Sequence, residues 1–126
     1  HKMKRLRDVG IDRITFGMEH GNEAFRRDVV KREYSNKEAV RCLKIVSDSG
    51  VPFQVNNIIG FPTETRDLIF ETIELNRKIP AYDAMTVNTF VPYQGTVLHK
   101  KCVELGLIGK EKAIACEVIA SVVNYV

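Results

Sequence analysis

Three short apolar segments alternate with amphipathic helical patterns, and this alternation limits the possible folds more than any other feature of the chain. The segments cover residues 13–18, 53–59 and 84–90, and Gly, Pro or polar residues bound each one. Strands separated by helices form βα units, which assemble into a parallel sheet through right-handed crossovers. The sequence therefore predicts an α/β fold with its helices on one side of a parallel sheet.

Local signals mark the two helices between these strands. Ser35 and Glu38 have the spacing of a capping box, in which each side chain satisfies a free amide of the first helical turn. We expect this helix to end at Gly50. The next helix is expected to be capped by Thr63 and to end near Pro80.

Weaker helical patterns lie at the two ends of the chain. Residues 1–9 are expected to form a helix that Gly10 stops, and a helix beginning at Thr96 is expected to end at Gly106. Residues 107–126 are predicted to form a C-terminal helical extension. A chain of 126 residues is expected to be a single domain, so we assign residues 1–126 to one unit.

The predicted sheet has one apolar face and one largely polar face. Phe16, Val55 and Val87 share the apolar face, whereas Asn56 and Asn88 lie on the other. Parallel strands covered by helices on both sides are usually apolar throughout. The polar face therefore favours the wall of a barrel, with helices outside and a polar ligand cavity inside. Three strands cannot close a barrel, so we expect a segment of one.

Composition argues against a nucleic-acid partner, without excluding one, and against a membrane protein. The chain is 44% hydrophobic and 28% charged, and its net charge of +3 is too small and too dispersed to favour a nucleic-acid partner. The longest apolar stretch, 113–126, is too short to span a bilayer and contains Glu117 and Asn124. No secretory leader is evident. We expect a cytoplasmic protein without a membrane partner.

The cysteines do not form a metal-binding pattern. Cys42, Cys102 and Cys116 are far apart in the sequence, and no close pair indicates zinc or a redox motif. Cys42 and Cys102 fall on the apolar faces of predicted helices. We therefore expect buried, inert thiols and no metal ligand in this chain.

Candidate site residues lie in the segments that follow the three strands, because parallel α/β folds bind ligands beyond the carboxyl ends of their strands. These segments are 17–21, 60–64 and 91–96, and each contains glycine. On the residues alone, the glycines indicate tight strand-to-helix turns.

The three segments together resemble the radical S-adenosylmethionine superfamily. Residues 14–19 resemble its fourth strand. Residues 56–64 resemble its fifth-strand motif Gly-x-Ile-x-Gly-x-x-Glu, with Ile58, Gly60 and Glu64 matching and Asn56 replacing the first glycine. Pro92-Tyr93-x-Gly95-Thr96 resembles the segment after the sixth strand in cobalamin-associated and related members. The resemblance extends over residues 5–105 and is closest to cobalamin-binding or methylthiotransferase-like members.

The resemblance implies a partial (βα)6 barrel related to the TIM barrel. It also implies a 4Fe-4S cluster that reductively cleaves S-adenosylmethionine, giving a radical that abstracts hydrogen from a substrate. The chain contains neither the family's Cys-x-x-x-Cys-x-x-Cys motif nor its Gly-Gly-Glu. We therefore expect the C-terminal half of the barrel of an oxidoreductase or transferase, inactive alone. Its expected partner is the N-terminal half, which would supply the cluster ligands. Substrate, reaction subclass and cobalamin dependence stay open.

The resemblance also implies roles for individual residues in binding S-adenosylmethionine. Glu19 matches a polar cofactor contact on the fourth strand. Asn56 matches a position that hydrogen-bonds the ribose hydroxyls, and Arg32 one that pairs with the methionyl carboxylate. Adenine would lie against Ile58 and the backbone near Val91, beside the turn at Gly60. No catalytic residue is expected in the chain itself.

Each polar candidate also has a structural explanation. Glu19 would equally suit a nearby helix N-terminus, and Asn56 would suit the end of a strand. Arg32 lies in a basic stretch with Arg26, Arg27 and Lys31, so it would equally be surface charge. His20 is interpreted as a loop residue, His99 as a solvent-facing helix residue, and Glu64 as an acidic residue of the first turn of its helix.

Two other interpretations of the whole chain remain. One is a non-catalytic βα module that binds a nucleotide or a partner chain. The other is a barrel enzyme with a glycine-rich phosphate loop, against which stands the absence of Gly-x-Gly-x-x-Gly from the sequence. The strand at 13–18 would be an unpaired edge, which predicts a homodimer unless residues 1–9 fold over it.

Overall fold

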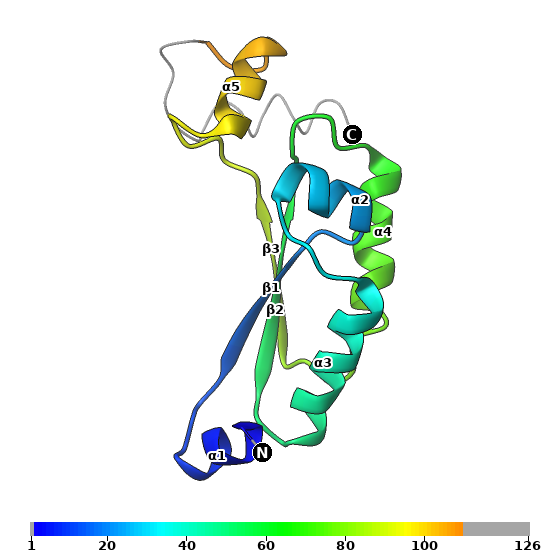
Figure 1. Ribbon diagram of the computed structural model, residues 1–126, viewed down its shortest axis with the longest axis vertical. Helices are drawn as coiled ribbons and strands as arrows, with labels where there is room; N and C mark the ends of the chain where they lie inside the picture. The colour runs from blue at the N-terminus through cyan, green and yellow to red at the C-terminus, as the bar shows by residue number, and fades with distance from the viewer. Residues whose placement is uncertain (1, 110–126) are drawn as a thin grey trace.

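The computed structural model describes residues 2–109, in which a three-stranded sheet lies beside helices (Figure 1). The elements and their bounds are α1 (Lys2–Asp8), β1 (Ile14–Glu19), α2 (Glu23–Phe25), the π-helical turn η1 (Arg26–Val30), α3 (Asn36–Asp48), β2 (Phe53–Ile59), α4 (Arg66–Asn76), β3 (Ala84–Thr89) and α5 (Val97–Glu104). The three predicted strands are therefore present, each within one residue of its predicted bounds.

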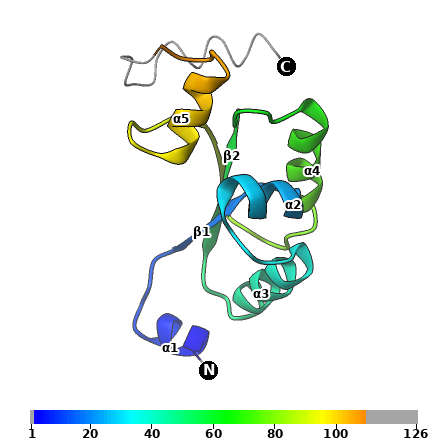
Figure 2. The ribbon, with the colours of Figure 1, turned by 45° about the horizontal axis from the view of Figure 1, so that its top comes forward.

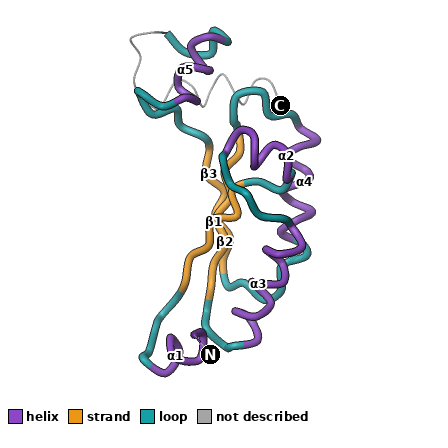
Figure 3. The backbone as a smooth tube through the Cα atoms, viewed as in Figure 1, coloured by secondary structure: helices purple, strands orange, loops and turns teal. Residues whose placement is uncertain are grey.

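The strands form one parallel sheet in the order β1-β2-β3. Helices α3 and α4 both lie on the same side of this sheet, and α5 lies at its carboxyl end, away from them (Figures 1 and 2). Figure 3 shows the strands as a twisted layer beside the helices. The predicted parallel α/β arrangement with helices on one side is confirmed.

The helix α3 begins where the capping box predicts. The Ser35 hydroxyl accepts the Glu38 amide at 3.1 Å, and the Glu38 carboxylate accepts the Ser35 amide at 3.0 Å. Gly50 follows the helix with a φ of +72°, a conformation that glycine adopts without steric cost. Both ends of α3 are thus specified by residues within the helix itself or next to it.

The predicted start of α4 is wrong by two residues. Thr65, not Thr63, is the N-cap, and its hydroxyl accepts the Leu68 amide. Thr63 instead has a φ of +72°, so it lies inside the preceding turn. Two threonines in one short segment are both good caps, and only the turn's conformation selects between them.

The core lies between the sheet and the two helices. Its buried apolar side chains come from β1, β2, α3, α4 and the turn after α4, namely Met18, Leu43, Val46, Phe53, Val55, Leu75 and Ile79. One polar pair interrupts it: the buried amides of Asn57 and Asn76 hydrogen-bond each other reciprocally, at 3.2 and 3.1 Å. The apolar face predicted from the strands did not include this pair.

The strand β3 is the least covered part of the sheet. Met85 and Val87 on its helix-facing side are nearly half exposed, and they line an apolar groove of about 260 Å³ between β3 and α4. Burial on the helix side therefore decreases from β2 to β3.

At the opposite edge, α1 lies at the amino ends of the strands and does not run alongside β1 (Figures 1 and 2). Its Arg7 donates to the Ser49 carbonyl at 3.2 Å, next to the end of α3. Gly10 ends this helix with a φ of +76°, as predicted.

The cysteine prediction is half correct. Cys102 on α5 is buried, and burial raises the pKa of its thiol. Cys42 is exposed, because it lies beside the buried stripe of α3 that Leu43 and Val46 occupy. Cys116 and most of the predicted extension at 107–126 lie outside the described residues. Within residues 2–109, no helix has the length and hydrophobicity needed to cross a membrane.

Candidate functional site

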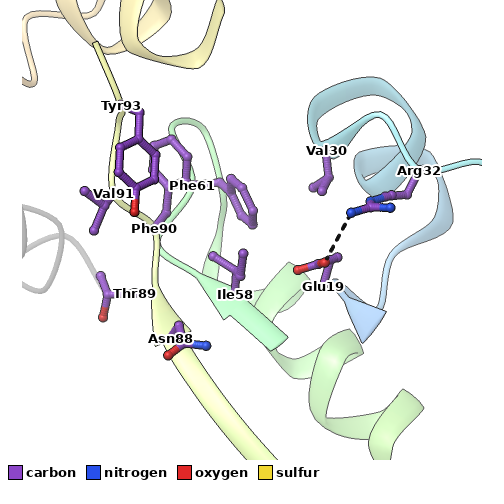
Figure 4. Close-up of a pocket in the computed structure, with 10 residues that line it drawn as sticks. All are labelled: Glu19, Val30, Arg32, Ile58, Phe61, Asn88, Thr89, Phe90, Val91 and Tyr93. Atoms are coloured by element: carbon purple, nitrogen blue, oxygen red, sulfur yellow. Dashed lines mark ion pairs between the residues drawn. The ribbon is translucent and has the colours of Figure 1, made fainter. Parts of the chain in front are cut away.

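A cavity of about 520 Å³ lies at the carboxyl ends of the three strands. Figure 4 shows the side chains around it. They come from the end of each strand, from η1 and from the segments that follow, namely Glu19, Val30, Arg32, Ile58, Phe61, Asn88, Thr89, Phe90, Val91 and Tyr93. The cavity therefore lies where the sequence predicts a ligand.

Backbone geometry at the end of β1 places Glu19. The register with β2 shifts between Gly17 and Glu19, and Glu19 has a φ of +61°. This irregularity folds the Glu19 side chain back, so that its carboxylate would collide with a Cβ atom on Gly17. Gly17 is thus required for this position of the carboxylate, which is only 16% exposed.

Arg32 reaches the same cavity from the end of η1. Lys31 has a φ of +61°, and the Arg32 amide donates to the Arg26 carbonyl at 3.1 Å, which closes the turn. The guanidinium lies 3.8 Å from the Glu19 carboxylate, and its side chain is 60% exposed. Such a long, exposed ion pair contributes little stability, so a ligand could replace it at small cost.

Asn56 lies on the cavity side of β2 but does not line the cavity. It is in register with Gly17 on one neighbour and Thr86 on the other. Its Oδ1 atom is buried and has no hydrogen-bond partner among residues 2–109. A buried acceptor without a partner is costly, which indicates that this atom is suited to a ligand donor.

The rest of the wall is apolar. Phe61 and Phe90 lie with their ring centroids 4.9 Å apart. Ile58 lies near Phe61 on the side toward Glu19, and Val91 lies beside Phe90 (Figure 4). Gly60 is buried next to them with a φ of +82°, so it shapes the turn without lining the cavity. The cavity thus has a charged end at Glu19 and an aromatic end.

Arg26, a member of the basic stretch around Arg32, is not a surface residue. Its side chain is completely buried. It donates to the carbonyls of His20 and Tyr34 and to the Asn36 side chain, at 2.5 to 2.8 Å, and it packs 4.0 Å from the Tyr34 ring centroid. Arg26 therefore holds the β1–α2 turn to the segment before α3. The folded β1–α2 turn brings Arg26 to these partners. No sequence pattern distinguishes Arg26 from the basic residues next to it.

His20 lies in a loop, as interpreted, whereas Glu64 and His99 differ from their predicted environments. His20 is fully buried, and its Nε2 atom lies 2.9 Å from the Glu64 carboxylate. Glu64 precedes α4, so it does not belong to the first turn of that helix. Its carboxylate instead accepts the amides of Gly60 and Phe61. His99 is buried as well, although it was expected to face solvent.

The described residues do not fit an iron–sulfur cluster. Within residues 2–109, no group of three His, Cys, Asp or Glu side chains could hold a metal ion. Exposed Cys42 on α3 and buried Cys102 on α5 share no site. Cluster ligands, if the protein has them, must come from other residues.

Comparison with known families identifies the chain's relationship. The model of the Radical SAM superfamily matches residues 1–75, which contain β1, α3, β2 and most of α4. No curated protein matches the chain in sequence. The matched region covers more than half of the 126 residues and includes two of the three strand ends that form the cavity. The chain therefore belongs to the radical SAM superfamily.

Proposed function

We propose that this chain forms the S-adenosylmethionine-binding wall of a radical SAM enzyme, as part of a partial (βα)6 barrel. The observation that carries the proposal is the polarity of the cavity. An ion pair lies at one end and an aliphatic and aromatic wall at the other. S-Adenosylmethionine has the same division, with a zwitterionic methionyl group at one end and adenine at the other.

The charged end suits the methionyl group. The Arg32 guanidinium would pair with the ligand carboxylate, since its planar fork matches two carboxylate oxygens. Glu19 would accept from the ligand ammonium. Both interactions replace the 3.8 Å contact between the two side chains, which is too long for a hydrogen bond.

The middle of the sheet suits the ribose. The Asn56 amide can donate and accept, and its buried Oδ1 has no partner among the described residues. A ribose hydroxyl would supply the missing donor. Asn56 lies behind the cavity wall, so this contact requires the ligand to reach deeper than the open cavity or the amide to turn toward it.

The apolar end suits adenine. The rings of Phe61 and Phe90 offer flat surfaces, and Ile58 and Val91 lie beside them (Figure 4). An aromatic base would gain stacking energy there and would exclude water from the rings. Gly60 keeps the turn tight enough for Phe61 to enter the wall.

The reaction depends on groups that residues 2–109 do not supply. A 4Fe-4S cluster held by residues outside 2–109 would supply the electron for the reductive cleavage of S-adenosylmethionine and so the radical chemistry of the family. The described residues would bind and orient S-adenosylmethionine for this step. The remaining strands of the barrel are the partner that we propose for the open β1 edge.

The finer assignment to cobalamin-binding or methylthiotransferase-like enzymes depends on residues 92–96. In the structure Gly95 has a φ of +86°, and the Thr96 hydroxyl accepts the His99 amide at 3.2 Å as the cap of α5. These roles explain both residues structurally. Cobalamin therefore stays an open part of the proposal, as does the choice between an oxidoreductase and a transferase.

The proposal is tested with the protein expressed from its complete reading frame. It is reconstituted anaerobically with iron and sulfide, reduced with dithionite and incubated with S-adenosylmethionine. Formation of 5′-deoxyadenosine, measured by liquid chromatography, is the expected result. A protein that binds four irons yet gives no 5′-deoxyadenosine above a cluster-free control would contradict the proposal. A protein that binds nucleotides without assembling a cluster would support the non-catalytic module instead.

A further inference from the structure

We propose that His20 is a positioning residue that sets the aromatic end of the cofactor cavity through Glu64. This inference rests on the proposed function, because it names a residue that fixes the wall of the same binding site. His20 itself does not line the cavity. It lies in the β1–α2 turn, whereas Glu64 lies in the β2–α4 turn. The pair therefore joins the two turns that follow neighbouring strands.

The hydrogen bonds of His20 define its tautomer. Its Nδ1 atom accepts the Asn22 amide at 3.0 Å, so in the neutral ring the proton must lie on Nε2. Nε2 lies 2.9 Å from Oε1 of Glu64, and both side chains are essentially inaccessible to water. The two atoms are close without the alignment of a regular hydrogen bond, and neither has another partner among residues 2–109.

Glu64 also forms hydrogen bonds with the backbone of the cavity wall. Its second oxygen accepts the backbone amides of Gly60 and Phe61, the latter at 3.1 Å. Phe61 is part of the cavity wall. The position of the Glu64 carboxylate therefore fixes the backbone of the turn that presents Phe61 to the ligand.

The rings make a second connection between the same residues. The His20 ring lies against Phe25 with centroids 4.5 Å apart, and Phe61 contacts Phe25 edge-on at 5.9 Å. On its other side Phe61 packs against Phe90 of the cavity wall at 4.9 Å. Phe61 thus packs between the His20–Phe25 ring pair and the cavity, so a displaced His20 ring would also displace Phe61.

The His20 side chain is not what holds its own turn in place. The turn's backbone is fixed by Arg26, which donates to the His20 carbonyl at 2.6 Å, and by the Gly21 amide, which donates to the Thr72 hydroxyl at 2.8 Å. Gly21 packs so closely on α4 that a Cβ atom would overlap the backbone of Glu71 and Thr72. Replacing the imidazole should therefore loosen the link to Glu64 without releasing the β1–α2 turn.

Two amide substitutions separate the two ends of the imidazole. In His20→Asn the amide oxygen can replace Nδ1 and accept from Asn22, but nothing reaches Glu64. In His20→Gln the longer amide can replace Nε2–H and donate to Glu64. Both variants are made in the protein expressed from its complete reading frame. Calorimetric titration with S-adenosylmethionine and hydrogen exchange of the Gly60 and Phe61 amides are measured for each.

We expect His20→Asn to raise the Kd for S-adenosylmethionine by about tenfold and to speed exchange at Gly60 and Phe61, on the scale of one lost contact to a charged group. His20→Gln should stay within about threefold of wild type by the same reasoning. Equal affinity in wild type and His20→Asn, or equal losses in both variants, would overturn the positioning role. Wild-type protein that binds no S-adenosylmethionine would defeat the proposed function itself, and the positioning role with it.

A measurement on the wild-type protein keeps the proposal testable if His20→Asn does not fold. Nitrogen NMR of the imidazole distinguishes the two neutral tautomers. The contacts require a proton on Nε2, and slow exchange of the Gly60 and Phe61 amides. A proton on Nδ1 would contradict the hydrogen bond from Asn22 and the contact with Glu64 together.

Discussion

Individual arginines in one basic stretch have different roles. Arg26 is buried and holds two segments together, Arg32 reaches the cavity, and Arg27 pairs with its neighbour Asp28 at 2.8 Å in solvent. Their sequence environments are nearly the same. Arg26 and Arg27 are the first two residues of the π-helical turn η1, whereas Arg32 follows its left-handed C-cap Lys31, so the three side chains leave the backbone in different directions.

The first prediction concerns Arg32. Arg32→Ala should weaken S-adenosylmethionine binding by roughly 1.5–3 kcal/mol, the range for hydrogen bonds to a charged group. Because the side chain is largely exposed before the ligand binds, the lower end of that range is expected. Titration calorimetry of the protein from its complete reading frame measures it.

Arg27→Ala is the matched control for Arg32, because Arg27 is exposed and is not part of the cavity wall. Arg26 is unsuitable as a control, since its loss would disturb the fold. Equal effects from Arg27→Ala and Arg32→Ala would indicate diffuse surface charge and remove Arg32 from the site.

Elements of this fold were predictable where their signals are local. The capping box starts α3, and apolar segments mark the three strands, so these elements agree with the sequence prediction. The Asn57–Asn76 pair was not predictable, because its two amides come from different elements that only packing brings together.

The candidate site shows the same difference between residues with local sequence signals and residues whose contacts depend on packing. Four candidates from strand ends and family motifs do line the cavity, namely Glu19, Arg32, Ile58 and Val91. His20 and Arg26 were missed because their partners lie on other turns, and no local pattern encodes such partners.

The second prediction concerns the buried amide pair. Asn57→Ala should lower the free energy of unfolding by about 2 kcal/mol, because it leaves the buried Asn76 Oδ1 without a donor, although the Asn76 Nδ2 still donates to the Thr72 carbonyl. Replacing both residues by leucine should cost less than the sum of the single changes, since neither polar group is then stranded. Urea denaturation measures each variant, with Asn88→Ala on the exposed side of β3 as control. Additive losses would show that the two amides act independently.

The third prediction concerns acid and the capping box. Hydrogen bonds from Ser35 lower the pKa of Glu38 below its usual value. A lowered folded-state pKa means that the ionised carboxylate stabilises the fold above its unfolded pKa of about 4.3, and that this stabilisation is lost as pH falls through the folded value. Glu38→Gln should therefore lose less stability than wild type between neutral and acidic pH. Urea midpoints at several pH values test this, with Glu33→Gln as control. Parallel curves for wild type and Glu38→Gln would contradict it.

At the scale of the whole molecule, β1 is an edge strand that pairs only with β2 among residues 2–109. The Ile14 amide donates to the carbonyl of Pro52, which precedes β2, at 3.0 Å. Since amides alternate in direction along a strand, the Thr15 amide points to the other edge of β1. Arg13 at the start of β1 pairs with Asp83 at 3.7 Å and does not cover that edge. In a complete barrel another strand would pair there.

The fourth prediction follows from this edge. The 126-residue chain alone should form a dimer at micromolar concentration, and Thr15→Pro should make it a monomer by removing an edge amide. Thr15→Val keeps the amide and should leave the dimer intact. Sedimentation equilibrium distinguishes the two variants. A wild-type chain that stays monomeric at all concentrations would contradict this edge association.

The proposed function requires S-adenosylmethionine to bind at the carboxyl ends of the three strands. Hydrogen exchange of the protein from its complete reading frame, with and without S-adenosylmethionine, tests this binding position. We expect slower exchange in residues 17–19, 56–61 and 88–93, which surround the cavity and the buried Asn56 Oδ1. Unchanged exchange in all three segments, or protection confined to the groove between α4 and β3, would contradict it.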